Sequence, residues 1–230
     1  MKNKKIILLI GRENLEKDSH LYTDVFAKLQ SLPYSFFFDP SDQIRHAFNH
    51  KLFSYIPKFI KEFFYLSKLA RLGIIAFVFC KQGIFDWSYL KAFRKNPNDI
   101  DVRLSALLKK IKTFPKGTQI TLVGRSAGAI LATKISLQVP IHQIICLAYP
   151  FKHPDCAEEP FRYEHLVHVT TPTLIIQGEN DPYGGREVID KYPMNVSTKV
   201  IFEDLDHDFQ LTEKTRQRLI LLIKSKLVED

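Results

Sequence analysis

A five-residue segment, Gly124-Arg125-Ser126-Ala127-Gly128, joins a strand-like run to a helix-forming run. The run before it is Ile120-Thr121-Leu122-Val123, and the run after it is Ala129-Ile130-Leu131-Ala132-Thr133-Lys134. A strand, a tight turn and a helix in this order form one unit of an α/β fold. We expect the two glycines to remove Cβ atoms that would collide in so sharp a turn, which presents Ser126 above the edge of a sheet.

The serine at the centre of this segment has two interpretations. Ser126 could cap the N-terminus of the following helix, a position that serine favours. It could instead be a nucleophile held in a strained strand-to-helix turn, the context that a G-x-S-x-G motif requires. The flanking strand and helix favour the nucleophile, which then needs a base and an acid from elsewhere in the chain.

Apolar runs alternate with amphipathic segments along most of the 230 residues. Strands that are apolar throughout, separated by helices with one apolar face, imply a mainly parallel sheet covered on both faces. We therefore predict a doubly wound α/β fold in a single domain over residues 1–230. The predicted strands are 5–10, 34–38, 119–123, 143–149, 173–177 and 198–202, and the predicted helices are 19–32, 99–111, 129 to about 139, 185–191 and 212–227.

One segment, residues 44–95, breaks the alternation. It carries ten basic and two acidic residues, so its net charge of +8 equals that of the whole chain. Aromatic residues crowd it, and apolar residues recur at helical spacing from Leu52 and Ile56 to Phe63. We predict a mostly helical, basic and aromatic-rich insertion, in which 74–79 could instead form a strand.

The insertion has four possible roles. It could be a lid whose aromatic face lines an apolar acyl pocket over Ser126, or a helical excursion that contacts another subunit or only solvent. It could also touch an anionic membrane surface peripherally or bind nucleic acid. Aromatic residues at helical spacing are usually buried, which favours the first two roles. Nucleic acid is not expected as a partner because no recognised binding motif accompanies the charge. The oligomeric state stays open.

Cysteine use and the apolar runs bear on the compartment. The three cysteines, Cys80, Cys146 and Cys156, are odd in number and have no C-x-x-C spacing, which favours a reducing compartment. The apolar stretch near the N-terminus is too short for a signal peptide, and no run approaches a membrane span. We expect a cytoplasmic protein.

Two histidines, His165 and His168, stand three residues apart, as metal ligands often do. No carboxylate or cysteine completes the set, so we expect surface or capping histidines. We expect neither a metal nor a cofactor.

Two later segments offer partners for Ser126. Asp181 follows the apolar strand 173–177, and His207 follows the strand 198–202. Each therefore lies in a loop at the carboxyl end of a strand. In open parallel sheets this edge is where sites assemble, so we expect Ser126, Asp181 and His207 to meet there.

The motifs together resemble those of the α/β-hydrolase superfamily. The stretch Thr171-Pro172-Thr173-Leu174-Ile175-Ile176-Gln177-Gly178-Glu179-Asn180-Asp181 is similar to the strand and turn that carry the family's acid, and Asp206-His207-Asp208-Phe209 resembles its histidine loop. The order serine, acid, histidine is also that of the family. The Gly-Arg-Ser-Ala-Gly turn and Tyr149-Pro150-Phe151 are similar to the small dienelactone-hydrolase-like and KANSL-type subgroup.

This resemblance implies a serine hydrolase of a small-molecule carboxylic ester or thioester that works through an acyl-enzyme. Ser126 would be the nucleophile, His207 the general base and Asp181 the acid that orients it. The backbone N–H of Ala127 would be one oxyanion donor. The family usually has His-Gly after the first strand, where this chain has Ile10-Gly11-Arg12, so the Arg12 N–H is the candidate for the second donor.

Alternatives remain for the acid and for the function. Asp155 lies after the preceding strand, a position that some relatives use for the acid. Asp204, Asp206 and Asp208 are interpreted as solvated or turn-forming loop residues. A binding or scaffold protein that keeps the hydrolase fold without turnover is the alternative function, suggested by the absent His-Gly motif and the large insertion.

Overall fold

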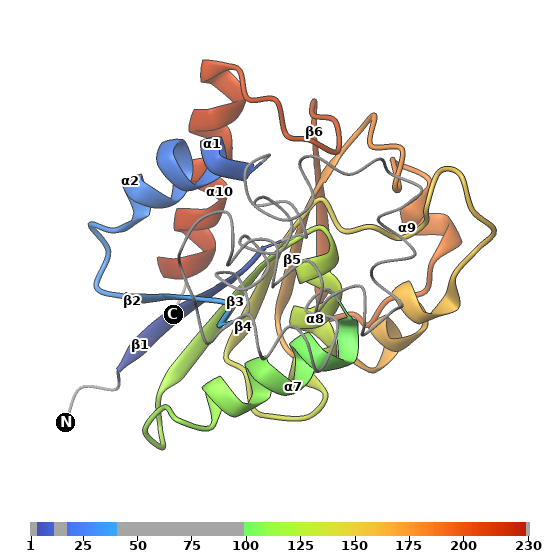
Figure 1. Ribbon diagram of the computed structural model, residues 1–230. Coiled ribbons are helices and arrows are strands. Elements are labelled where there is room, and N and C mark those ends of the chain that lie inside the picture. The colour runs from blue at the N-terminus through green and yellow to red at the C-terminus, as the bar shows by residue number, and fades with distance from the viewer. Residues whose placement is uncertain (1–3, 12–17, 41–98, 229–230) are drawn as a thin grey trace, which may run out of the picture. The chain divides into compact units, whose positions relative to one another are not determined.

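The computed structural model describes residues 4–11, 18–40 and 99–228 (Figure 1). The predicted insertion 44–95 and the oxyanion candidate Arg12 lie outside these ranges. The chain divides into two compact units, residues 1–39 with 111–230, and residues 40–110. In the second unit the structure describes most of α7 (Ile100–Ile111), which was predicted, and the Asp99 carboxylate accepts hydrogen bonds from the N–H groups of Asp101 and Val102 at the start of this helix.

The first unit is built on a six-stranded sheet in which every neighbouring pair is parallel. The strand order is β2-β1-β3-β4-β5-β6. β2 therefore lies on one side of β1, and β3 to β6 follow in chain order on the other side. The doubly wound, mainly parallel sheet predicted from the apolar runs is confirmed. Its strands are β1 (Lys5–Ile10), β2 (Ser35–Phe38), β3 (Gln119–Arg125), β4 (Gln143–Leu147), β5 (Thr173–Gly178) and β6 (Thr198–Glu203).

The predicted helices are present with shifted boundaries. Residues Ser19–Leu29 form one helical stretch whose middle turn is a π-helix, and the helix after the Ser126 turn ends at Ser136. The short helix predicted over 185–191 begins only at Val188. Two 3-10 helices before β5 were not predicted. The elements of the first unit are α1 (Ser19–Leu21), η2 (Tyr22–Phe26), α2 (Ala27–Leu29), α8 (Ala127–Ser136), η4 (Pro160–Arg162), η5 (Glu164–His168), α9 (Val188–Lys191) and α10 (Glu213–Val228).

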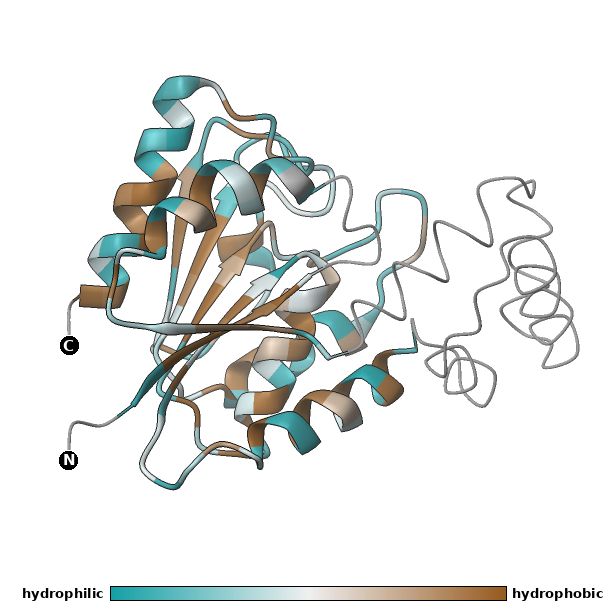
Figure 2. Cartoon of the chain, turned by 60° about the vertical axis from the view of Figure 1, so that its left-hand side comes forward, coloured by the Kyte–Doolittle hydropathy of each residue, from teal (hydrophilic) through white to brown (hydrophobic). Residues whose placement is uncertain are grey.

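The sheet of the first unit is covered on both faces (Figures 1 and 2). On one face, alternate strand residues such as Ile7 and Ile145 pack with Val25 of η2 and Ile223 of α10. On the other face lies α8, which contacts β1, β3 and β4. The central strands are apolar on both faces because both are buried, as Figure 2 shows.

Since all six strands run the same way, the loops after β3, β5 and β6 leave the sheet at one edge. Ser126, Asp181 and His207 follow these strands. Among the helices in the described ranges, none combines the length and the apolar character needed to cross a bilayer.

Candidate active site

Ser126 lies in a backbone conformation that few non-glycine residues adopt. Its φ is 51° and its ψ is −122°, between the end of β3 and the start of α8. Its N–H donates to the carbonyl of Leu147 at 3.0 Å, and its own carbonyl accepts from the N–H of Ala129 at 2.7 Å. These bonds hold the strained turn, whose cost the surrounding structure must offset.

The two glycines of the segment are required by close backbone approaches. A Cβ on Gly124 would lie 2.5 Å from the Cα of Ala129, and a Cβ on Gly128 would overlap the carbonyl oxygen of Ile10. The expectation that side chains would collide in this turn is confirmed. The second approach also brings the start of α8 against the carboxyl end of β1.

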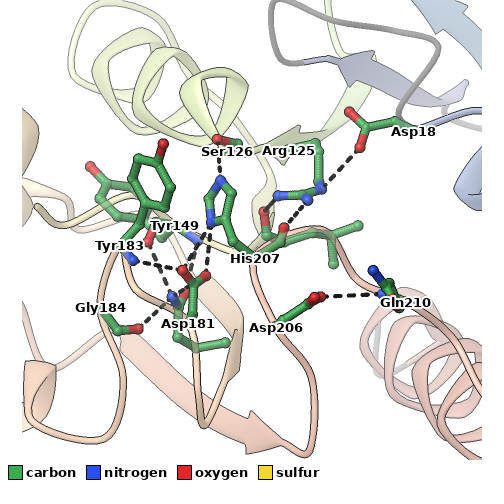
Figure 3. A network of polar contacts seen from close by, with 12 residues as sticks. Asp18, Arg125, Ser126, Tyr149, Asp181, Tyr183, Gly184, Asp206, His207 and Gln210 are labelled. Atoms are coloured by element: carbon green, nitrogen blue, oxygen red, sulfur yellow. Dashed lines mark hydrogen bonds and ion pairs between the residues drawn. The ribbon is translucent and has the colours of Figure 1, made fainter. Parts of the chain in front are cut away.

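The Ser126 hydroxyl points to a histidine and does not cap the helix. No hydrogen bond joins the Ser126 side chain to the first turn of α8, so the capping interpretation is wrong. Ser126 Oγ instead lies 3.0 Å from His207 Nε2 (Figure 3). The buried Ser126 hydroxyl therefore has the His207 ring nitrogen as its hydrogen-bond partner.

The opposite nitrogen of the same ring faces a buried carboxylate. His207 Nδ1 lies 3.0 Å from Asp181 Oδ1 and 2.9 Å from Asp181 Oδ2. A carboxylate only accepts hydrogen bonds, so Nδ1 carries the proton and Nε2 offers its lone pair to the Ser126 hydroxyl. The side chains of Ser126, His207 and Asp181 thus form one hydrogen-bonded chain, in an orientation that would allow His207 to accept the serine proton.

Asp181 is held by the loop that carries it and by the strand before it. Its side chain is fully buried. Oδ1 accepts from the N–H of Tyr183 at 2.8 Å, and Oδ2 accepts from Gln177 Nε2 at 3.0 Å. Several donors on one buried carboxylate stabilise its charged form.

The loop that carries His207 is anchored from beneath. Arg125, the residue before the serine, donates from Nη2 to the backbone carbonyl of His207. Its guanidinium lies 4.9 Å from the ring centre of Phe209, and its Nε is 3.4 Å from Asp18 Oδ1. Gly178, at the end of β5, approaches the Leu205 carbonyl so closely that a Cβ would overlap it. The backbone on both sides of His207 is therefore fixed to the sheet.

The start of α8 supplies a hydrogen-bond donor beside Ser126. Ala127 is the first residue of the helix, so its N–H has no acceptor within the helix. The expected second donor, the N–H of Arg12, lies outside the described residues.

The other acidic candidates have different surroundings. Asp155 is exposed, and its N–H donates to its own neighbour His153. Asp204 is exposed, and Asp206 accepts from the N–H of Gln210 within the histidine loop. The carboxylate on the His207 ring is that of Asp181.

His165, expected to be a surface or capping residue, also makes a contact with a neighbouring helix. His165 is half-buried on η5, and its Nε2 lies 2.8 Å from Thr133 Oγ1 of α8. Its Nδ1 is buried without a hydrogen-bond partner among the described residues, so a proton there would have no acceptor. Burial and the nearby Lys134 lower the pKa of His165 to about 4. Its neighbour His168 is exposed.

Metal ligands do not gather in the part of the chain that the structure describes: no group of three His, Cys, Asp or Glu side chains is present there. Cys146 is buried in β4, as predicted, and burial raises the pKa of its thiol, which makes it unreactive. Cys156 is free and exposed.

Besides Arg125, two residues at the site were not predicted to have a role there. Gln177 was interpreted only as part of the acid strand. The ring of Tyr183 lies over the His207 ring with 4.1 Å between the centres, and His153 meets Tyr183 edge-on. Tyr183 follows Asp181 in the turn, so a search for aromatic residues near the acid would have found it, whereas the contact itself depends on the fold.

Comparison with known proteins agrees with this architecture. A family model described as an alpha/beta hydrolase domain matches residues 77–226. Among curated proteins none matches.

Solved structures with the same fold span nearly the whole chain. Est1E from Butyrivibrio proteoclasticus has a TM-score of 0.55 at 12% identity over 99% of this chain and 88% of its own. A protein from Xanthomonas campestris pv. campestris assigned to the alpha/beta hydrolase superfamily has a TM-score of 0.54 at 15% identity, over 98% of this chain and 99% of its own. An alpha-beta serine hydrolase homologue from Coxiella burnetii has a TM-score of 0.51 at 18% identity, over 96% of this chain and 85% of its own.

Proposed function

The chain belongs to the alpha/beta hydrolase domain family, and on that premise we propose that it is a serine hydrolase of a carboxylic ester or thioester. The observation that carries the proposal is the hydrogen-bonded chain from Ser126 through His207 to Asp181, with the serine in a strained turn. Strain at a position of this kind is typical of a functional residue.

In the proposed reaction Ser126 Oγ attacks the carbonyl carbon while His207 Nε2 takes the hydroxyl proton. The carbonyl π electrons move to oxygen, and the tetrahedral intermediate collapses with cleavage of the bond to the alkoxide or thiolate leaving group. That group takes the proton from His207 and leaves an acyl-enzyme on Ser126. Water then attacks the acyl carbon with His207 as base, which releases the acid and restores the serine. Asp181 stabilises the imidazolium that forms twice in this cycle.

The negative charge on the carbonyl oxygen needs donors on the helix side of Ser126. The N–H of Ala127 is the first, and we propose the N–H of Arg12 as the second. A position after β1 is favourable because Gly128 already lies against the Ile10 carbonyl. Each such donor lowers the barrier by about 2.7–4 kcal/mol.

The substrate class is proposed from the chemistry of the site. We propose a small-molecule acyl ester or thioester, with residues 44–95 as the lid that selects it, and membership of the dienelactone-hydrolase-like and KANSL-type subgroup. A peripheral membrane contact of 44–95 is the second role for this segment. The reaction as written needs no cofactor.

A fluorophosphonate probe, which phosphonylates activated serines, tests the proposal. Wild type should be labelled and Ser126→Ala should not. Ser136→Ala, on the same helix but with a hydroxyl that donates to the Thr133 carbonyl, should be labelled as wild type is. Equal labelling of wild type and Ser126→Ala would refute the assignment. p-Nitrophenyl esters of short and long chains then separate turnover from a scaffold role, because a scaffold would show no Ser126-dependent hydrolysis.

A further inference from the structure

Gln177 is a fully buried glutamine at the carboxyl end of β5, four residues before the proposed acid. Burying a primary amide is unfavourable unless its polar atoms find partners. Both ends of this amide do. Oε1 accepts from the N–H of Tyr149 at 2.8 Å, and Nε2 lies 3.2 Å from the Tyr149 carbonyl, 3.0 Å from Asp181 Oδ2 and 2.7 Å from the Gly184 carbonyl.

These contacts occur where β4 and β5 separate. The pairing of the two strands ends at Leu147 and Ile176, and the N–H of Ala148 makes the last backbone bond to the Ile176 carbonyl at 2.9 Å. Ala148 then has a φ of 47°, which turns the chain away from β5. The Gln177 side chain bonds the backbone of Tyr149 in place of the lost strand partner. It thereby joins the end of β4 to the acid turn.

The acid turn is tied to the same amide at two points. The Gly184 carbonyl and Asp181 Oδ2 both accept from Gln177, while the Tyr183 N–H closes the turn on Oδ1. Gln177 therefore fixes the rotation of the carboxylate that faces His207 Nδ1. It touches neither the serine nor the space where a carbonyl would be attacked, so its action would pass through Asp181.

We infer that Gln177 is a positioning residue for Asp181: its amide orients the Asp181 carboxylate and, by donating to it, weakens the interaction of the carboxylate with the protonated His207 ring. This inference rests on the proposed hydrolase function. A carboxylate that loses a donor concentrates more negative charge toward the imidazole and favours its protonated form. The charged or titratable groups in contact with His207 are the Asp181 carboxylate, the Tyr183 ring and the Arg125 guanidinium at its backbone carbonyl. Gln177 is neutral, so its replacement by Met changes hydrogen bonding and shape but no charge.

The pH dependence of kcat/KM for a p-nitrophenyl ester tests this role, since its acid limb reports protonation of the base in the free enzyme. Gln177→Met should lower kcat/KM about ten-fold or more, the range for one hydrogen bond to a charged group, and should move the acid limb up by about one pH unit. Gln177→Leu removes the same donor with a smaller side chain and should move the limb in the same direction.

A matched control is Gln143→Met. Gln143 is also a buried glutamine, but it lies at the opposite end of β4, where it donates to Thr121 Oγ1 at 3.3 Å. This variant should keep the acid limb of the wild-type kcat/KM profile, even where its thermal stability changes. If Gln177→Met and Gln177→Leu both keep the wild-type limb while wild type hydrolyses the ester, Gln177 is only a core residue and the inference is overturned. If Gln177→Met fails to fold, the limb of Gln177→Leu decides. Absence of Ser126-dependent labelling in wild type would instead refute the proposed function.

Discussion

Arg125, at the end of β3, contacts both the backbone of the proposed base His207 and the buried Asp18 carboxylate. Replacing Arg125 should therefore lower the free energy of unfolding and disturb the position of His207. The side chains of Arg125 and Asp18 are 5% and 1% exposed, with 3.4 Å between Nε and Oδ1. Arg125→Met fills a similar volume but leaves the buried Asp18 carboxylate without the guanidinium charge. Breaking a buried pair by removing one partner costs about 3–5 kcal/mol. A domain has only about 5–15 kcal/mol of stability in total, so the loss should be large.

Denaturant unfolding measures this loss directly from the shift in midpoint at constant slope. Asp18→Asn and the double variant complete a double-mutant cycle, in which we expect a coupling of about 1–3 kcal/mol between the two sites. Arg125→Lys keeps the charge but not the fork that reaches the His207 carbonyl, so it should fall between wild type and Arg125→Met. Fluorophosphonate labelling should decrease in Arg125→Met because the histidine loop loses an anchor. A loss below about 1 kcal/mol, or additive single variants, would show that this ion pair does not hold the loop.

Two further outcomes follow from the packing of the same unit. The lowered pKa of His165 means that the unfolded chain takes up a proton below about pH 6.5, whereas the folded chain takes it up only near pH 4. Stability should therefore fall as the pH drops through this window, by up to about 3 kcal/mol, and urea unfolding at several pH values should show a weaker fall for His165→Gln; equal slopes would contradict the assignment. Gly128→Ala places a Cβ on the Ile10 carbonyl and should cost about 1–3 kcal/mol together with most of the labelling. A Gly128→Ala protein with the melting temperature and labelling of wild type would show that the turn has more room than the structure indicates.

The parts of the fold that the sequence predicts are those set by local pattern. Strands buried on both faces are apolar at every position, so runs such as Ile6–Ile10 are visible without knowledge of their neighbours. Parallel strands place their following loops at one edge, which is why chain position alone brings Ser126, Asp181 and His207 together. The role of the two glycines beside Ser126 is also predictable, because the sharpness of the turn that requires them is a local property of the chain.

The supports of the site are not visible in this way. Gln177 looks like any residue of a buried strand, and its contacts depend on the turn of the backbone at Ala148, in another strand. Arg125 reads as a variable position between two motif residues, and its burial depends on Asp18, more than a hundred residues earlier. His165 resembles a surface histidine until its helix packs on Thr133 of α8. Each of these roles is created by packing between distant segments, which no spacing in the sequence records.

The order of the strands has a consequence for the chain during its synthesis. The base is 81 residues beyond the serine, after β6, which is the last strand and lies at an edge of the sheet. A ribosome that adds about 5–20 residues per second leaves the serine without its base for roughly 4–16 seconds. Through this interval the nascent chain carries the hydroxyl but not the group proposed to activate it. Reactivity would then arise only when the last strand docks, so a probe for the serine would also report the completion of the sheet.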